Sequence, residues 1–424
     1  MSDLFITSVR LIDPTSGLDQ SGSLLIRDGK IADIGPRLAK PEGIKTLDGN
    51  GAILCPGLVD MRVELGEPGG EHRETIITAA QAAAAGGITT VASLPNTTPA
   101  IDDPALVRLL RSRGEETGSL TILPYAAVTR GCQGTDIAEL GLLREAGAVA
   151  FTDGTNAIAS TRMMRLALSY ARGFGARIVQ HPADPSLALG GVATEGALAS
   201  RLGLPAIPAA AEAILVARDV RLAALTKGAV HFAHVSTADA LDLIRQAKQD
   251  GLSVTCDTAP PYFDLNETAI GEFRTYAKLS PPLRCERDRQ AVVTALADGT
   301  IDAIASDHQP RDADDKRLPF AQAAAGGTGL ATLLAVTLAQ VHSEKISMIK
   351  ALSLLTHRPA ELLDSQAGTL AVGAPADLCL FAPEHVWQVS AGDLPGKAQN
   401  TPFDGRALEG LVLGTWKSGR RVFG

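Results

Sequence analysis

The sequence predicts a (β/α)8 barrel of the TIM type, with a small composite β-sandwich domain formed by the N- and C-terminal segments. Apolar runs of strand length alternate with helical stretches through about 250 residues in the middle of the chain, the usual size of such a barrel. Shorter strand-like runs with turn signals occupy both ends. Because strands joined by helical crossovers are parallel, eight of them favour a closed barrel, although an open doubly wound sheet stays possible.

The two ends of the chain share one pattern. Short strands are predicted within residues 4–34, most clearly in LLIRDGKIADIG, where Asp28-Gly29 separates two partly alternating apolar runs as a hairpin turn. The segments 376–383 and 408–424 have the same character. The chain is therefore expected to begin in a β domain, build the barrel and return. The predicted parts are 1–53 for the first half of the β domain, 54–365 for the barrel and 366–424 for the second half.

Eight apolar runs supply the predicted barrel strands. They end near Asp60, Leu94, Ala127, Thr152, Gln180, Ala233, Cys256 and Ser306. Helical stretches lie between most of them, and those at 162–175 and 238–251 place apolar residues at i, i+3 and i+4 and end on glycine. The stretch 74–87 closes on a glycine pair, which is a helix-ending signal.

Charge and cysteine content exclude several classes of protein. The 424 residues include 39 basic and 47 acidic ones without a basic block, so neither nucleic acid nor an anionic membrane is an expected partner. The five cysteines are widely spaced and odd in number, which indicates reduced thiols in a cytoplasmic protein rather than a disulfide framework. We expect no signal peptide, and no apolar run is long enough for a membrane span.

Four polar side chains are expected at one mouth of the barrel. Asp153, His181, His234 and Asp307 each follow a predicted strand, and the carboxyl ends of barrel strands form the active site in enzymes of this fold. Two imidazoles and two carboxylates that converge from four strands are typical of a site for Zn²⁺ or a similar ion. The alternative is that each is a lone polar residue at the end of its strand.

Several motifs, in order along the chain, carry a resemblance to a known family. They are CPGLVDMRVELGEPGGEHRETI (55–76), AAAAGGITTVASLPNTTP (82–99), FTDG (151–154), HFAHVST (231–237), KLSPPLR (278–284), SDHQP (306–310), LLTHRPAELL (354–363), LAVGAPADLCLF (370–381) and NTPFDG (400–405). With these motifs the chain resembles the dihydroorotases of the amidohydrolase superfamily, which share their ancestry with hydantoinases and allantoinases. The resemblance implies the barrel, the composite β domain and the closure of carbamoyl-aspartate to dihydroorotate in pyrimidine biosynthesis.

The chain departs from this family at residues that carry its chemistry. Where the family has D-x-H-x-H-L-R-E-P-G, Arg62 and Glu64 replace two metal-binding histidines, and Gly66 replaces the arginine that holds the substrate carboxylate. Arg311 replaces the substrate-contacting histidine of D-H-A-P-H, and Ser280 replaces the asparagine of N-P-P-L-R. The retained positions are Asp153, His181, His234, Asn96 and Asp307.

Arg62 decides between two interpretations of these departures. A guanidinium has no lone pair and stays cationic, so it cannot ligate Zn²⁺ and repels it. Without the metal and the carboxylate clamp little remains for hydrolysis. We therefore expect a non-catalytic pseudoenzyme with no cofactor, in which Asp307 is a vestigial base and Asn96 a vestigial substrate ligand. The alternative is an active cyclic-amide hydrolase with a reduced site, in which one zinc ion is held by Asp153, His181, His234 and Asp307, with Glu64 as a fifth ligand.

The resemblance also implies a partner. Some bacteria carry an inactive dihydroorotase-like subunit bound to aspartate carbamoyltransferase, the enzyme one step upstream, and the chain resembles that subunit. We therefore expect a homo-oligomer within a larger complex. Segment 312–327 corresponds to the family's mobile loop over the site, and it is expected to be either flexible or ordered by a partner.

Arg62 is further expected to fill the space of the lost metal ion. Positions two residues apart share one face of a strand, so the side chains at 62 and 64 both project into the former metal pocket. The hypothesis is that the guanidinium pairs with one of three carboxylates there, and that both retained histidines stay as hydrogen-bonded core residues. The three carboxylates are those of Asp307, Asp153 and Glu64.

Overall fold

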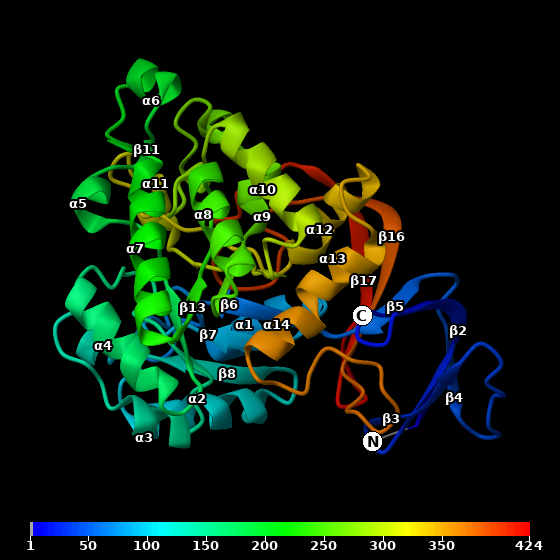
Figure 1. Ribbon diagram of the computed structural model, residues 1–424. Helices are drawn as coiled ribbons and strands as arrows, with labels where there is room; N and C mark the ends of the chain where they lie inside the picture. Colours follow the sequence, from blue (N-terminus) through cyan, green and yellow to red (C-terminus); the bar gives the residue numbers. More distant parts are fainter. Residues whose placement is uncertain (1–2) are drawn as a thin grey trace.

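The computed structural model describes residues 3–424 and contains a parallel (β/α)8 barrel beside a mostly antiparallel sheet (Figure 1). This architecture confirms the predicted fold class. The two parts are built in the predicted order, because both ends of the chain lie in the sheet and the middle forms the barrel.

All eight predicted barrel strands are present, in chain order and parallel. They are β6 (Leu58–Val63), β7 (Ile88–Ser93), β8 (Thr121–Ala126), β9 (Ala150–Phe151), β10 (Arg177–Gln180), β13 (Ala229–Phe232), β14 (Val254–Thr258) and β15 (Ala303–Ile304). A parallel bridge between Val63 and His308 brings the last strand back to the first, so the barrel is nearly closed.

Helices cover the outside of the barrel. The longer ones are α1 (Ile76–Ala85), α2 (Pro104–Thr117), α4 (Thr161–Arg172), α7 (Ala210–Thr226), α8 (Ala238–Gln249), α10 (Glu286–Asp298), α12 (Leu333–His342) and α13 (Met348–Leu355). The shorter ones are α3 (Leu140–Glu145), α5 (Pro185–Ala188), α6 (Ala197–Leu202), α9 (Pro260–Asp264), α11 (Ala313–Arg317) and α14 (His357–Leu362), with single 3₁₀ turns at Arg130–Cys132, Glu267–Ile270 and Thr275–Ala277. Helix α1 begins with a capping box between Thr75 and Thr78 and ends at the predicted glycine pair, where the Gly86 N–H bonds to the last turn.

The second part is one hydrogen-bonded sheet drawn from both ends of the chain. Its strands are β1 (Leu4–Asp13), β2 (Leu18–Arg27), β3 (Lys30–Gly35), β4 (Lys45–Asp48), β5 (Ile53–Pro56), β16 (Leu378–Gln388), β17 (Ala407–Lys417) and β18 (Arg420–Phe423). Asp28 and Gly29 form the predicted hairpin turn, with φ angles of 49° and 76° that this turn requires. Strand β5 pairs with β1 and β16, so the sheet continues three residues beyond the boundary expected after residue 53. A separate two-stranded pairing joins β11 (Ala193–Thr194) to β12 (Ala206–Ile207).

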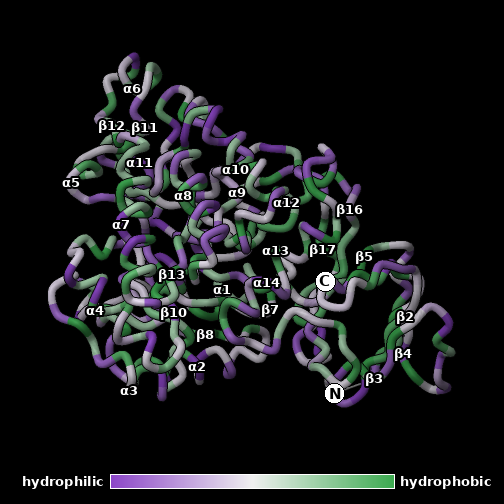
Figure 2. Tube along the Cα trace, viewed as in Figure 1, coloured by the Kyte–Doolittle hydropathy of each residue, from purple (hydrophilic) through white to green (hydrophobic). Residues whose placement is uncertain are grey.

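Apolar residues gather along the strands and the inner faces of the helices, and hydrophilic ones along the outer loops (Figure 2). The largest buried cluster fills the layer between barrel strands and helices. A smaller cluster inside the barrel combines large side chains such as Met61 and Tyr125 with several alanines. Within the described residues, no helix combines the length and the apolar character that crossing a bilayer requires.

Candidate active site

The structure places the predicted site residues at the carboxyl ends of the barrel strands. Arg62 lies near the end of β6, and Asp153, His181, His234 and Asp307 follow β9, β10, β13 and β15. All five side chains are buried or nearly so. The backbones of His234 and Asp307 have φ angles of 41° and 50°. Non-glycine residues keep this strained conformation where the surrounding structure imposes it, and such positions are common at functional sites.

Four of these residues form one hydrogen-bonded chain, Arg62–Asp307–His234–His181, which we call the rebuilt centre. The Arg62 guanidinium donates from Nε to Asp307 Oδ1 over 2.8 Å. The second carboxylate oxygen lies 3.0 Å from His234 Nδ1, and His234 Nε2 lies 2.6 Å from His181 Nδ1. Arg62 is only 1% exposed, so water does not screen the ion pair. The structure confirms that Arg62 pairs with one of the three carboxylates and that both histidines are hydrogen-bonded core residues.

A bulge in β6 accompanies the new position of Arg62. The pairing of β6 with β7 changes register between Asp60 and Val63, the stretch that contains Arg62. Bulges beside active sites commonly redirect one side chain. Here the guanidinium reaches across the mouth, where its Nη2 donates to the carbonyl oxygen of Gly154 over 3.2 Å.

The charges of the rebuilt centre set its protonation states. Burial alone would raise the pKa of Asp307, but the neighbouring His234, which is hydrogen-bonded to it, outweighs burial together with Arg62 and Gln309 and lowers that pKa to about 2. Burial is the main cause that lowers the pKa of His181 well below its usual range, and the neighbouring His234 and Arg62 act in the same direction. At neutral pH Asp307 is therefore a carboxylate and His181 a neutral imidazole.

The other two carboxylates lie apart from this centre. Asp153 accepts hydrogen bonds from the Thr129 N–H over 2.9 Å and from Thr129 Oγ1 over 2.5 Å. Burial nevertheless raises the pKa of Asp153. Glu64 forms an ion pair with Arg311, with 2.5 Å between Glu64 Oε2 and Arg311 Nη1. Each of the three carboxylates therefore has its own donor, and Arg62 pairs with Asp307 alone.

These contacts leave no donor set for a zinc ion. Arg62 offers no lone pair, and its guanidinium binds a carboxylate oxygen of Asp307 that an ion would need. His181 and His234 are hydrogen-bonded to each other through one ring nitrogen each. Among residues 3–424, no three histidine, cysteine, aspartate or glutamate side chains are grouped so that they could hold a metal. The residues present do not fit the single zinc ion of the alternative interpretation.

The substrate-contact positions differ in backbone as well as in side chain. Gly66 has a φ of 77°, and a Cβ there would lie 2.1 Å from the carbonyl oxygen of Glu74, so the family's arginine has no room at this position. Asn96 donates to Glu64 Oε1 over 3.4 Å, while its own Oδ1 has no partner among the described residues. Ser280 is half-buried and precedes a cis proline.

Two further side chains beside the centre were missed by the sequence analysis. Arg284 is 4% exposed and donates from Nε to Ser236 Oγ over 3.0 Å. Gln309 donates to Asp307 over 2.9 Å and accepts from Arg311 over 3.1 Å, so it links the rebuilt centre to Arg311. Arg284 could have been identified from the sequence, because it is the last residue of the family motif KLSPPLR. Gln309 stood in the altered D-H-A-P-H motif without an obvious partner.

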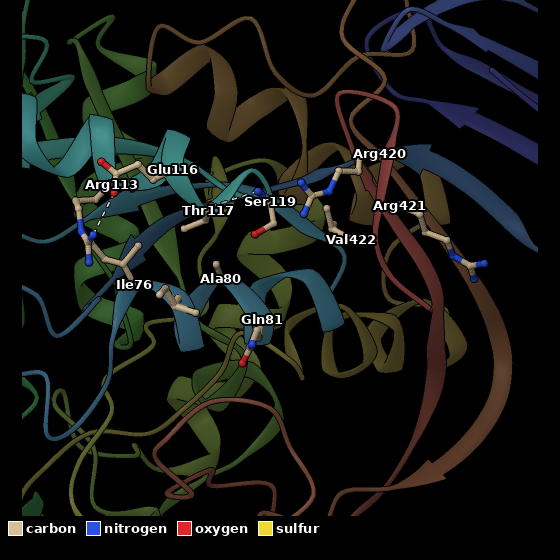
Figure 3. A pocket seen from close by; sticks show the side chains of 11 residues that line it. Ile76, Ala80, Gln81, Arg113, Glu116, Thr117, Ser119, Arg420, Arg421 and Val422 are labelled. Carbon is tan, nitrogen blue, oxygen red and sulfur yellow. Dashed lines mark hydrogen bonds and ion pairs between the residues drawn. The ribbon is translucent and has the colours of Figure 1, made fainter. Parts of the chain in front are cut away.

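A separate cavity of about 510 Å³ lies between α1, the end of α2 and β18 (Figure 3). Figure 3 shows Arg420 directed toward Ser119, whereas Arg421 points away from the other lining residues. None of the predicted site residues lines this cavity. The rebuilt centre itself borders a cavity of only about 10 Å³, beside Pro260 and Phe403, which holds about one water molecule.

Comparison with known proteins relates the whole chain to one family. The family model described as Dihydro-orotase-like matches residues 51–240. The chain is 41% identical over 421 residues to the Dihydroorotase of Citrifermentans bemidjiense, with 99% of each chain covered. It is 42% identical over 422 residues to the Dihydroorotase of Anaplasma phagocytophilum, with 98% of this chain and 94% of that protein covered.

Solved structures support the fold. The L-hydantoinase of Arthrobacter aurescens matches with a TM-score of 0.88 at 24% identity, covering 100% of this chain and 96% of that chain. The dihydropyrimidinase of Brevibacillus agri matches with a TM-score of 0.85 at 23% identity, covering 99% of this chain and 95% of that chain. At these identities the likeness concerns the fold alone.

The curated relatives contradict the prediction of a non-catalytic pseudoenzyme. Proteins about 41% identical over almost the full length carry the name of an enzyme, Dihydroorotase, and none of these names indicates an inactive subunit. The prediction is therefore wrong. It rested on the lost ligands, which argue against the family's metal-based chemistry but not against every route to hydrolysis. By its full-length identity to these relatives, the chain belongs to the dihydroorotase family.

Proposed function

We propose that the chain is a cyclic-amide hydrolase of the dihydroorotase type, which opens or closes a ring that bears a carboxylate. The observation that carries this proposal is the 41% identity to a protein named Dihydroorotase along 99% of the chain. The rebuilt centre supports it, because a cation, an ionised carboxylate and a neutral imidazole lie together at the barrel mouth, where enzymes of this fold act.

His181 is the proposed general base. When Nδ1 of His234 donates to Asp307, Nε2 of His234 accepts the hydrogen from Nδ1 of His181. Nε2 of His181 then carries a lone pair, which takes a proton from the attacking water in ring opening or from the attacking nitrogen in ring closure. The protonated His181 returns this proton to the ring nitrogen as the C–N bond breaks in opening, or to the hydroxide that leaves the carboxyl carbon as water in closure. The carboxylate of Asp307 orients the two imidazoles and stabilises the positive charge that they gain, as the third member of a catalytic triad does.

Arg62 is the proposed partner of the reacting carbonyl group. Its Nη1 is buried and has no hydrogen-bond partner among residues 3–424, whereas Nε and Nη2 are held by Asp307 and Gly154. A fixed, buried donor with positive charge stabilises the oxyanion that forms when the amide carbon is attacked. Arg62 would therefore supply the polarisation for which other hydrolases use a metal ion.

Arg284 is the proposed ligand of the substrate carboxylate. Its Nη1 is also buried without a partner among the described residues, while Nε is fixed by Ser236 and Nη2 lies 3.6 Å from Glu212 Oε2. The family's clamp position is closed at Gly66, so we assign this role to the Arg284 guanidinium, which comes from the loop before α10.

Turnover by protein treated with a chelator tests the proposal. We expect ring opening of dihydroorotate or ring closure of carbamoyl-aspartate, and a loss of about a hundredfold or more in kcat for His181→Gln, the size of a general-base contribution. The matched control is His385→Gln, because His385 is exposed on β16, outside the barrel. Absence of turnover in both directions, with and without added Zn²⁺, would overturn the proposed function.

Association with aspartate carbamoyltransferase stays a prediction, as do the homo-oligomer and the cytoplasmic location. All three rest on the family resemblance and on composition. A tagged chain purified from its native cells should carry the transferase with it, and mass measurement of that material gives the oligomeric state. A chain that purifies alone, from an extract in which the transferase is complete and stable, would remove the partner.

A further inference from the structure

A second cavity at the barrel mouth is lined mainly by positive charge. It has a volume of about 120 Å³ and is formed by the loop after β6, the segment that contains α11, and the loop before β17. Four cationic side chains line it: Arg73, Arg311, Lys316 and Lys397. We call this the cationic cavity.

Three of these four cations have no carboxylate partner among residues 3–424. Arg311 binds Glu64, but no ion pair within 4.0 Å involves Arg73, Lys316 or Lys397. The one acidic residue in the lining, Asp312, lies 3.4 Å from His72, which is exposed. Positive charge in the cavity therefore exceeds negative charge.

Lys316 is a buried lysine that lies close to other cations. It is 3% exposed, and its Nζ donates to three backbone carbonyl oxygens, those of Ala324 at 2.8 Å, Thr275 at 3.1 Å and Lys278 at 3.3 Å. Burial, followed by the positive charges of Arg311 and Lys278, lowers the pKa of Lys316 to about 7. Burial disfavours a charge of either sign, but the two neighbouring cations, Arg311 and Lys278, favour an anion.

A purely structural role explains Lys316 but not its neighbours. The three carbonyl contacts give segment 312–327 a defined conformation, and this is a sufficient reason to bury one lysine. Arg73, in contrast, is half-buried, and its guanidinium makes no hydrogen bond within the described part of the chain. Lys397 is exposed and uses its Nζ for a single contact, with the carbonyl oxygen of Glu71 over 2.6 Å. These two side chains have free donors that face the same cavity.

We propose that the cationic cavity binds a small doubly charged oxyanion of the phosphate class. Arg73 and Lys397 supply the free donors, while Arg311 supplies charge at close range. The volume of about 120 Å³ is roughly twelve times that of the one-water cavity beside Pro260, which is enough for the oxyanion itself. The site shares no side chain with the rebuilt centre, so it stands whether or not the chain proves to be a hydrolase.

Calorimetric titration of the full chain with inorganic phosphate, at low ionic strength, tests the proposal. We expect saturable binding with one site per chain, weakened about tenfold in Arg73→Gln and in Lys397→Gln, since each removes a charge-assisted contact. The matched control is Arg420→Gln. Arg420 is another guanidinium without an ion pair among the described residues, but it lines the cavity of Figure 3 instead. Its loss should leave the affinity unchanged.

A parallel titration with glycerol 3-phosphate separates two sources of the same group. Tighter binding than inorganic phosphate indicates a phosphate ester, and equal or weaker binding indicates the free ion; both results support the site. No saturable binding of either compound would overturn the proposal. Equal affinities in wild type, Arg73→Gln and Lys397→Gln would also overturn it, because phosphate would then bind elsewhere. Neither variant changes a buried carbonyl contact, so both are expected to fold.

Discussion

The rebuilt centre and the cationic cavity lie at the same mouth of the barrel and each contains a buried cation. They differ in whether that cation has a carboxylate partner. In the rebuilt centre, Arg62 has the carboxylate of Asp307 at 2.8 Å. In the cationic cavity, Lys316 has only uncharged carbonyl oxygens around its ammonium group. The Arg62 guanidinium is neutralised by a carboxylate of the chain itself. The Lys316 ammonium group has no such carboxylate among the described residues, so an anion from solution can neutralise it. Stability, pH response and ligand binding should therefore differ between the two regions.

The largest effect is expected on removing the paired cation. Arg62→Ala leaves Asp307 buried without its ion-pair partner and should lower the free energy of unfolding by about 3–5 kcal/mol. Denaturant unfolding measures this value. The matched control is Arg10→Ala, which breaks the exposed pair with Asp19 and should cost no more than about 1 kcal/mol. If the two variants were equally stable, the ion pair between Arg62 and Asp307 would not stabilise the barrel mouth.

A smaller loss of stability is expected when a side chain is added at Gly66, the position of the family's carboxylate-binding arginine. Gly66→Ala combines a positive φ with a clash against the Glu74 carbonyl oxygen, so it should cost about 3 kcal/mol. Gly17→Ala is the matched control, because Gly17 has a φ of 71° with no atom within 4 Å of the added Cβ. It should cost about 1 kcal/mol, the price of the backbone conformation alone. Similar losses in both would mean that the backbone at Gly66 can relax around a side chain.

The sequence was sufficient to predict where the polar residues of the mouth lie. Strand ends can be read from apolar runs, and eight runs in order bring Asp153, His181, His234 and Asp307 to one end of a barrel. The hairpin at Asp28-Gly29 and the sheet built from both ends also follow from local pattern. These features depend on burial and backbone preference, which neighbouring residues determine.

The pairings inside the mouth were not predictable in the same way. Three carboxylates were candidates for Arg62, and the choice of Asp307 depends on a bulge in β6 and on donors from distant loops. Thr129 binds Asp153 and Arg311 binds Glu64, and neither donor stands out in the sequence as a partner. The cationic cavity joins residues more than 300 positions apart, which only the folded chain brings together.

A pH titration of stability compares the two regions directly. The pKa of Asp307 is lowered to about 2, so its contribution is present above the unfolded value near 3.9 and is lost as pH falls through about 2. The pKa of Lys316 is lowered from 10.5 to about 7, so the unfolded chain binds more protons between these values and stability rises with pH there.

Unfolding free energies measured from pH 2 to 10 separate the two contributions. Asp307→Asn should remove a loss of about 2 kcal/mol at the acid end and leave the alkaline end unchanged. Lys316→Met should flatten the rise at the alkaline end and leave the acid end unchanged. Inorganic phosphate should reduce the alkaline rise in wild type, because an anion in the cavity raises the pKa of Lys316. If the unfolding free energy of the wild type did not change with pH at either the acid or the alkaline end, the distinction between a paired and an unpaired cation would be contradicted.

A crystal structure of the protein grown with excess Zn²⁺ tests most directly whether Arg62 has taken the place of a metal ion. The expected result is an intact ion pair, with Arg62 Nε near 2.8 Å from Asp307 Oδ1, and no anomalous zinc signal between Asp307 and His234. A zinc ion bound by Asp307, His234 and Asp153, with Arg62 displaced from the mouth, would contradict it.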